Sequence, residues 1–191
     1  ILTVTVLLPV LGGALIPLLP FRSRRQMLIY IETVVLINTA LVLTALLNRP
    51  ADGFVLFHLN GKLSISFQLD GLGTVFAAIV SLLWPLATLY AFEYMTHEGH
   101  EKYFFMFYTI TYGITLGVAL SGDIVTMYVF FEMLSLVTVP LVMHTLTREA
   151  IHASRTYFFY MIGGAACAFM GMIFVLNYGS SSFVMGGGLN L

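Results

Sequence analysis

The sequence contains six long apolar segments, and this feature most strongly limits what the chain can fold into. A helix needs roughly 20 mostly apolar residues to cross the hydrocarbon core of a bilayer, which is about 30 Å thick. The segments that meet this requirement are residues 1–21, 27–47, 71–92, 103–122, 124–146 and 156–178. They predict an all-α integral membrane protein, in which residues 1–191 form a single transmembrane domain of about six helices.

Residues 1–21 have a second interpretation, because a secretory signal peptide is also short and apolar. The segment has no basic region before its apolar run and no small-residue cleavage site after it, and its arginine cluster comes last. We therefore expect residues 1–21 to be a true membrane span.

The composition excludes several classes of protein. Of the 191 residues, 59% are hydrophobic and only 9% are charged, whereas an average soluble domain is about 25% charged. The chain lacks the polar surface of a soluble enzyme, and it has no basic patch to bind nucleic acid. Its single cysteine, Cys167, excludes an intrachain disulfide framework, thiolate metal clusters and CxxC redox chemistry. We expect no metal site and no cofactor, since the sequence holds no flavin, iron–sulfur, haem or nucleotide motif.

The polar stretch of residues 48–70 has a different pattern. Polar side chains alternate there with the apolar side chains Leu63, Ile65 and Phe67. A period of two is typical of a β-strand. We therefore expect a short strand or hairpin in this loop, at the extracytoplasmic surface of the membrane.

The distribution of lysine and arginine predicts how the chain is oriented in the membrane. Short loops rich in these residues remain in the cytoplasm. The first, third and fifth connections between the apolar segments carry Arg22, Arg24, Arg25, Lys102, Arg148 and Arg155, whereas the second and fourth carry only Arg49 and Lys62. We expect a multi-pass protein of the prokaryotic inner membrane, with the odd connections in the cytoplasm and the N-terminus outside.

Glu132 is a carboxylic acid in the middle of an apolar segment. It lies nine residues beyond Asp123, which corresponds to a depth of about 13 Å in a helix. A carboxylate at the centre of a bilayer costs on the order of 2.5–3.5 kcal/mol, and Ser135 is a candidate hydrogen-bond partner. Because desolvation disfavours the charged form, Glu132 can hold a proton and release it when water or a cation approaches. The alternative is that Glu132 pairs with another helix and only locks the bundle.

Three further residues are candidates for proton transfer. His144 titrates near neutral pH, but it lies twelve residues past Glu132, about 120° away around a helix. His152 and Arg155 flank the start of the sixth segment. Two of them have plainer interpretations, with His144 as an interfacial histidine and Arg155 as a side chain that reaches lipid headgroups.

Other charged residues are expected to have structural roles. Glu32 lies about five residues into its segment, near the cytoplasmic interface. Asp70 and Asp123 stand at helix starts, where a carboxylate caps the helix and favours its dipole. The histidines and glutamates of residues 93–102 lack the HExxH spacing of a zinc site, so we expect a hydrated surface loop.

The most distinctive motif is Tyr128-Val-Phe-Phe-Glu-Met-Leu-Ser-Leu-Val-Thr-Val-Pro-Leu-Val-Met-His144. Together with Arg148-Glu-Ala150 and Arg155-Thr-Tyr-Phe-Phe-Tyr160, it resembles the antiporter-like family of proton-conducting membrane subunits. That family includes the D-type subunit of Mrp cation/proton antiporters, to which the motif looks most similar. It also includes the pumping subunits of complex I and their relatives in membrane-bound hydrogenases.

The resemblance implies a role for Glu132. In the family, the matching glutamate pairs with a lysine of a later span, and protons pass as that pair is modulated. This sequence contains only Lys62 and Lys102, both outside the interior of an apolar segment. Family members have more spans, and this sequence corresponds to the first six. We therefore expect the N-terminal portion of a longer subunit or a short version of one.

We expect a proton- or sodium-translocating subunit of an Mrp antiporter, a membrane-bound hydrogenase or a complex I-like assembly. The chain would not itself be an enzyme, because any redox chemistry would belong to partner subunits. Its expected partners are other membrane subunits and the lipid bilayer. The alternative is a non-conducting scaffold subunit, which the missing lysine favours. An intramembrane hydrolase using Ser135 and His144 is a weaker idea, since no oxyanion motif accompanies them.

Overall fold

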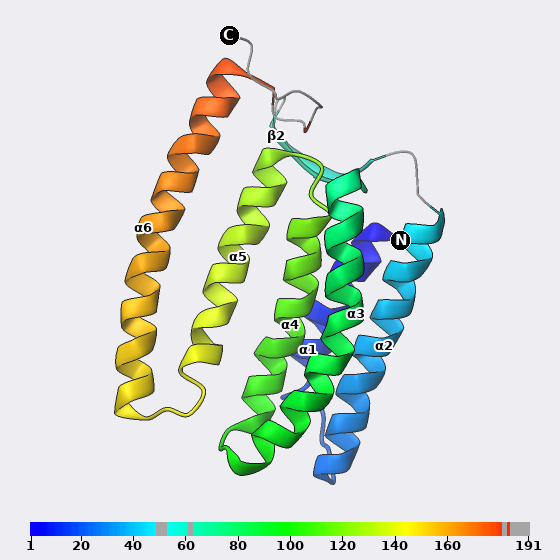
Figure 1. Cartoon of the computed structure of the whole chain (residues 1–191), viewed down its shortest axis with the longest axis vertical. Helices are drawn as coiled ribbons and strands as arrows, with labels where there is room; N and C mark the ends of the chain where they lie inside the picture. Colours follow the sequence, from blue (N-terminus) through cyan, green and yellow to red (C-terminus); the bar gives the residue numbers. More distant parts are fainter. Residues whose placement is uncertain (49–52, 61–62, 181–182, 184–191) are drawn as a thin grey trace.

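The computed structural model describes residues 1–48, 53–60, 63–180 and 183. These residues form a helical bundle with a β-hairpin at one end (Figure 1). A short 3₁₀ turn, Met95–His97, extends the third helix. The six α-helices of the described chain are α1 (Leu2–Leu15), α2 (Arg24–Asn48), α3 (Gly71–Tyr94), α4 (Glu101–Ala119), α5 (Ile124–Val142) and α6 (Arg148–Tyr178).

Successive helices run in alternate directions along the bundle (Figure 1). The α1–α2, α3–α4 and α5–α6 connections lie together at one end, which we call the basic end because it carries Arg22, Arg25 and Lys102. The other end, which we call the hairpin end, holds the strands and the α4–α5 connection. The first, third and fifth connections therefore lie at the same end of the bundle, as the distribution of lysine and arginine predicted.

The chain is a multi-pass membrane protein by the length and composition of its helices. In the described ranges, four helical segments are long and apolar enough to cross a membrane: α2, α3 with its 3₁₀ extension, α5 and α6. The apolar helix α1 has 14 residues and is therefore only about 21 Å long. The helix α4 has 19 residues but carries several polar side chains, and it lies inside the bundle.

Three differences between the helix boundaries and the predicted segments have a clear local cause or consequence. First, α1 ends at Leu15 rather than near residue 21, because Pro17 cannot continue the backbone hydrogen bonding of a helix. Second, α5 ends at Val142, with Pro140 in its last turn, so His144 lies beyond the helix. Third, residues 148–155 are helical rather than a connector, since Thr147 caps α6 by accepting a hydrogen bond from the Ala150 amide at 3.1 Å.

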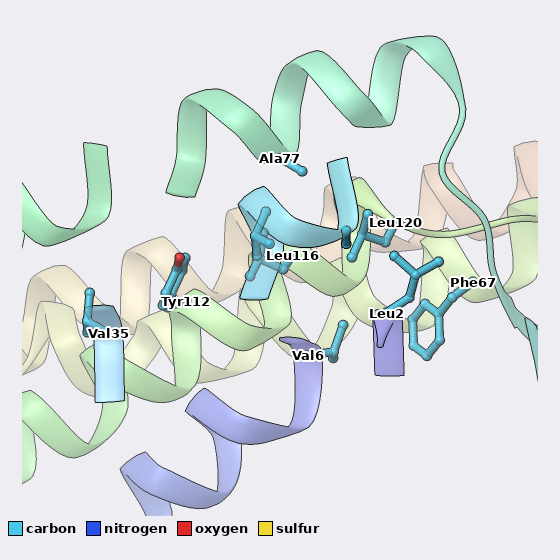
Figure 2. Packing of buried hydrophobic residues seen from close by; sticks show 10 residues of the cluster. Leu2, Val6, Val35, Phe67, Ala77, Tyr112, Leu116 and Leu120 are labelled. Carbon is cyan, nitrogen blue, oxygen red and sulfur yellow. The ribbon is translucent and has the colours of Figure 1, made fainter. Parts of the chain in front are cut away.

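Helix α4 is the centre of the packing. Helices α1, α3 and α5 all pack against it, whereas α6 packs against α5 at the edge of the bundle (Figure 1). Figure 2 shows Tyr112, Leu116 and Leu120 of α4 between side chains of the surrounding elements. The largest buried cluster is Leu2, Val6, Val35, Val42, Ala45, Phe67, Ala77, Tyr112, Leu116 and Leu120.

The hairpin predicted from the alternating pattern is confirmed. Strand β1 (Phe54–Asn60) pairs antiparallel with β2 (Leu63–Phe67). Ile65 and Phe67 are buried, as a period of two requires for one face of a strand. Backbone hydrogen bonds join β2 to the α4–α5 connection, from the Gly122 amide to the Ser66 carbonyl at 2.9 Å and from the Gln68 amide to the Leu120 carbonyl at 2.8 Å.

Asp123 and Asp70 have the capping roles that the sequence predicted. The Asp123 carboxylate accepts a hydrogen bond from the Thr126 amide at 2.7 Å and another from the Ser66 hydroxyl. The Asp70 carboxylate accepts one from the Gly73 amide at 2.6 Å. Asp123 therefore begins α5 and also holds β2 against it.

One ion pair ties three helices together at the basic end. Arg24 of α2 forms a salt bridge with Glu101 of α4, with an N–O distance of 2.7 Å. The same guanidinium donates hydrogen bonds to the Phe92 carbonyl and the Thr96 hydroxyl, at 2.7 and 3.1 Å. A bidentate, multiply bonded arginine loses less to side-chain entropy than an isolated surface pair. Its bonds therefore fix how α2, α3 and α4 meet.

Close contact between α1 and α4 should make Gly113 sensitive to substitution. A Cβ atom at Gly113 would lie 2.4 Å from the Val6 carbonyl oxygen of α1, and backbone cannot move aside like a side chain. We expect Gly113→Ala to lower the free energy of unfolding by about 1–3 kcal/mol. The measurement is denaturant-induced unfolding of the intact protein in detergent.

The matched control is Gly163→Ala on α6, where nothing lies within 4 Å of the added Cβ atom. This change should raise helix stability by up to about 1 kcal/mol. Equal stability of the two variants would contradict the close packing of α1 on α4.

Candidate functional site

Glu132 lies near the middle of α5 and faces α6. It is eight residues beyond Ile124 in this 19-residue helix, which is about 12 Å along the axis. Its side chain is half-buried, and its Oε1 atom is shielded from solvent without a hydrogen-bond partner. A buried carboxyl oxygen without a partner is costly in an apolar setting. The position therefore leaves one carboxyl oxygen of Glu132 shielded and without a hydrogen bond.

A small cavity adjoins the Glu132 carboxyl. Its volume is about 20 Å³, which is enough for a single water molecule. The cavity lies between two helices, and its walls are Glu132, Ser135 and Leu136 of α5 with Phe158, Met161 and Ile162 of α6. The walls other than Glu132 and Ser135 are apolar, so these two side chains would be the polar neighbours of a water molecule in this space.

The expected hydrogen bond between Glu132 and Ser135 is not formed. The Ser135 hydroxyl donates instead to the Phe131 carbonyl of its own helix, at 3.0 Å. A serine within a helix commonly donates a hydrogen bond to the carbonyl four residues earlier, and Ser135 does so here instead of bonding Glu132. The orphaned Glu132 oxygen thus remains without a partner among the described residues.

No cation of the described chain pairs with Glu132. The one salt bridge among the described residues joins Arg24 to Glu101. Lys102 donates to the Leu19 carbonyl at 3.3 Å and lies over the Phe21 ring, at the basic end. The family resemblance implies a lysine partner for Glu132, and Lys102 does not supply it.

Arg155 and His152 lie away from Glu132. Both are exposed on α6, and neither has an ion pair or a side-chain hydrogen bond within the described ranges. Arg155 precedes Phe158, which borders the Glu132 cavity, by about one helical turn. Side chains on a helix point towards its N-terminus, so Arg155 extends towards the basic end rather than into the cavity.

His144 belongs to a different place from Glu132. It lies in the turn after α5, where its Nδ1 atom bonds the Leu141 carbonyl at 2.8 Å and its ring packs on Phe104 of α4. Its Nε2 atom is buried without a partner in the described chain. An apolar cavity of about 320 Å³ adjoins the ring, between the ends of α4 and α5. Glu132 faces α6 and His144 faces α4, so the two side chains border separate cavities, as their angular separation predicted.

Sequence reasoning missed a second group of buried polar residues. Glu32 is deeper than expected, because α2 begins at Arg24 rather than at residue 27. Its Oε2 atom is buried without a partner in the described part of the chain, as are both polar atoms of the Asn38 amide group and the Trp84 indole nitrogen. The sequence feature that could have indicated this greater depth is the polar run Arg24-Arg-Gln, which forms the first turn of α2.

The histidine- and glutamate-rich loop at the basic end shows no metal-binding arrangement. Among the described residues, no three His, Cys, Asp or Glu side chains gather closely enough to hold a metal ion. Glu101 of this loop region is instead engaged by Arg24.

Comparison with known proteins supports the family resemblance. Residues 57–105 match the family described as NADH-ubiquinone oxidoreductase (complex I), chain 5 N-terminus. A Na(+)/H(+) antiporter subunit A1 from Staphylococcus aureus is 25% identical over 190 residues, which cover 96% of this chain and 24% of that protein. The chain thus spans about a quarter of the length of this curated relative. The local motif pointed to the D-type subunit, whereas this relative is named subunit A1.

Two solved structures share the fold. The archaeal membrane-bound sulfane sulfur reductase, a respiratory membrane complex, matches with a TM-score of 0.77 and 18% identity, covering 99% of this chain and 38% of the matched one. Respiratory complex I from Thermus thermophilus matches with a TM-score of 0.75 and 24% identity, covering 95% and 38%. The chain is therefore similar in sequence to a cation/proton antiporter subunit and to the complex I family over residues 57–105, and it shares the fold of these membrane subunits.

Proposed function

We propose that this chain is part of a proton- or sodium-translocating subunit of a multi-subunit complex in the prokaryotic cell membrane, with Glu132 as its protonatable centre. The observation that carries the proposal is the buried, unpartnered Glu132 oxygen beside a cavity of water size, near the middle of a membrane-spanning helix of the described chain. Intramembrane carboxyl groups of this kind commonly mark proton relays.

The steps of the proposed relay follow from the contacts of Glu132. Water entering between α5 and α6 brings a proton to the carboxyl, which is then neutral and needs no counter-charge. A cation that approaches the carboxyl favours its ionised form, so the proton leaves through the same water. The described chain holds no such cation near Glu132. The cation is therefore assigned to a partner element outside the described residues, as the resemblance implies.

His144 is a second candidate station in this relay. Its unpartnered Nε2 atom and the adjacent cavity place a titratable group at the basic end, near the exit that a proton would use. His152 and Arg155 are assigned only a role at the surface, because both side chains are exposed.

A scaffold subunit is the second candidate function. One observation favours it, which is that Lys102 is occupied at the basic end and the described spans offer Glu132 no cation. In that case α5 and α6 would present their apolar faces to neighbours without conducting ions. Substitution of Glu132 separates the two functions.

We expect Glu132→Gln to reduce proton translocation by at least about tenfold, because an amide of the same shape cannot bind and release a proton. The measurement is pH-dye fluorescence in liposomes that contain the intact complex. Glu149→Gln is the matched control, since Glu149 is exposed in the first turn of α6. A Glu132→Gln complex that assembles and transports at the control rate would make the chain a scaffold.

The proposed orientation puts the basic end in the cytoplasm. We expect a cysteine at Gln68, which lies at the hairpin end, to react with a membrane-impermeant maleimide on intact cells. A cysteine at His97, at the basic end, should react only after the membrane is permeabilised. Both variants carry Cys167→Ser, because the native thiol is exposed. The reverse labelling pattern would invert the orientation.

A further inference from the structure

A second set of buried and partly buried polar side chains lies between α2, α3 and α4, on the side of the bundle away from α6. We call it the inner polar seam, and its members are Glu32, Asn38, Thr39, Trp84, Thr88, Tyr108 and Tyr112. Asn38 and Tyr112 are fully buried. The α2 members Glu32 and Thr39 are seven residues apart, so the seam extends about 10 Å along the bundle.

Part of the seam is already connected by hydrogen bonds and ring contacts. The Thr39 hydroxyl bonds the Ser81 carbonyl at 3.0 Å and the Tyr112 hydroxyl at 3.1 Å. At the other end, the Thr88 hydroxyl lies 3.4 Å from the Tyr108 hydroxyl. The Trp84 ring bridges the two ends, since its centroid is 4.9 Å from that of Tyr112 and 5.2 Å from that of Tyr108.

The remaining polar atoms of the seam have no partner in the described part of the protein. They are the Glu32 Oε2 atom, the Asn38 Oδ1 and Nδ2 atoms and the Trp84 Nε1 atom. Glu32 acts electrostatically on the Tyr108 phenol, and the Asn38 amide lies close enough to the Tyr112 hydroxyl to interact with it, although neither Asn38 atom forms a hydrogen bond of standard geometry. Each buried donor or acceptor left unsatisfied costs about 1–3 kcal/mol. A seam that only held helices together would satisfy these atoms within itself.

The mixture of orphaned atoms selects the chemistry of the ligand. Asn38 Nδ2 and Trp84 Nε1 are donors, whereas Glu32 Oε2 and Asn38 Oδ1 are acceptors. A metal cation would satisfy only the acceptors, and an anion would satisfy only the donors while facing Glu32. Water is both donor and acceptor, and buried water typically bonds otherwise unsatisfied groups of this kind.

We propose that the inner polar seam binds water and that Glu32 is its protonatable group, which makes it a proton-binding site separate from Glu132. Glu32 lies within electrostatic range of Tyr108 on α4, whereas Glu132 borders a cavity between α5 and α6. The site stands on contacts within α2, α3 and α4, and it does not depend on the proposed role of Glu132.

Infrared spectroscopy of the intact protein in lipid tests the protonation of Glu32. A protonated carboxyl gives a C=O stretching band that shifts when H₂O is replaced by D₂O. We expect Glu32→Gln to lose one such band that Glu132→Gln keeps, and Glu32→Asp to restore a band at a shifted frequency. If Glu32→Gln and the unchanged protein have the same bands, Glu32 is ionised and the proposed proton site is wrong.

Radiolytic hydroxyl-radical footprinting tests for the water. Bound water is the source of radicals for a side chain that bulk solvent cannot reach. We therefore expect Tyr112, whose hydroxyl lies 3.1 Å from that of Thr39, to be modified faster than Phe105, which is equally buried but whose ring carries no polar atom. Asn38→Leu, which keeps the shape and removes both orphaned atoms, should reduce the Tyr112 rate to that of Phe105. Equal rates in the unchanged protein would show a dry seam and overturn the proposal.

The proposals for Glu32 and Glu132 are tested separately, so the failure of one does not decide the other. Normal translocation by Glu132→Gln would overturn the proposed function and leave the Glu32 band unaffected. Loss of the Glu32 band together with rapid Tyr112 modification would support the seam in either case.

Discussion

The cost of removing a charge or a polar group from water governs where this chain places its few ionisable side chains. Asp70 and Asp123 direct their charge to helix N-termini, where backbone amides bond them. Arg24 and Glu101 neutralise each other at the basic end. Among the described residues, only Glu32 and Glu132 carry a carboxyl oxygen that is enclosed in the bundle without a partner. The same physical rule that explains the first four residues therefore singles out the last two.

The central position of α4 makes the enclosed polar groups tolerable. Its tyrosines and threonines would be costly against lipid, because hydrocarbon offers no hydrogen bonds. Here α1, α3 and α5 cover it, and the close approach of α1 at Gly113 brings Val6 backbone against α4. Thr109 and Thr111 bond carbonyls of their own helix, at 2.8 Å in each case. A helix that would cross a membrane poorly alone is stable once it is surrounded.

The sequence predicted the class of fold well, because apolar length is a local property, and six apolar segments correspond to six helices of the described chain. The errors lie where short-range chemistry overrides length, since Pro17 ends α1 early and Thr147 starts α6 eight residues before the predicted segment. Glu132 stood out because its neighbours along the chain are apolar. Glu32 and Asn38 did not stand out, because their surroundings come from two other helices. Orphaned atoms exist only after the helices pack, so sequence spacing alone could not reveal them.

The two carboxyls lie at different places in the bundle, so the two proposed sites are separate. Glu132 is reached along α5 from the hairpin end, and Glu32 along α2 from the basic end, each about 12 Å into its helix. Glu132 lies at the α5–α6 interface, and Glu32 lies on α2. In the half of the bundle nearest the hairpin, α4 with its apolar residues Leu116 and Leu120 lies between these two places. Because α6 covers Glu132 on one side only and keeps an exposed apolar face, the cation proposed for Glu132 would approach past α5 or α6. Glu32 is only partly buried, but its Oε2 atom is shielded without a partner in the described bundle, so the proposed protonation of this group depends on water that reaches that atom.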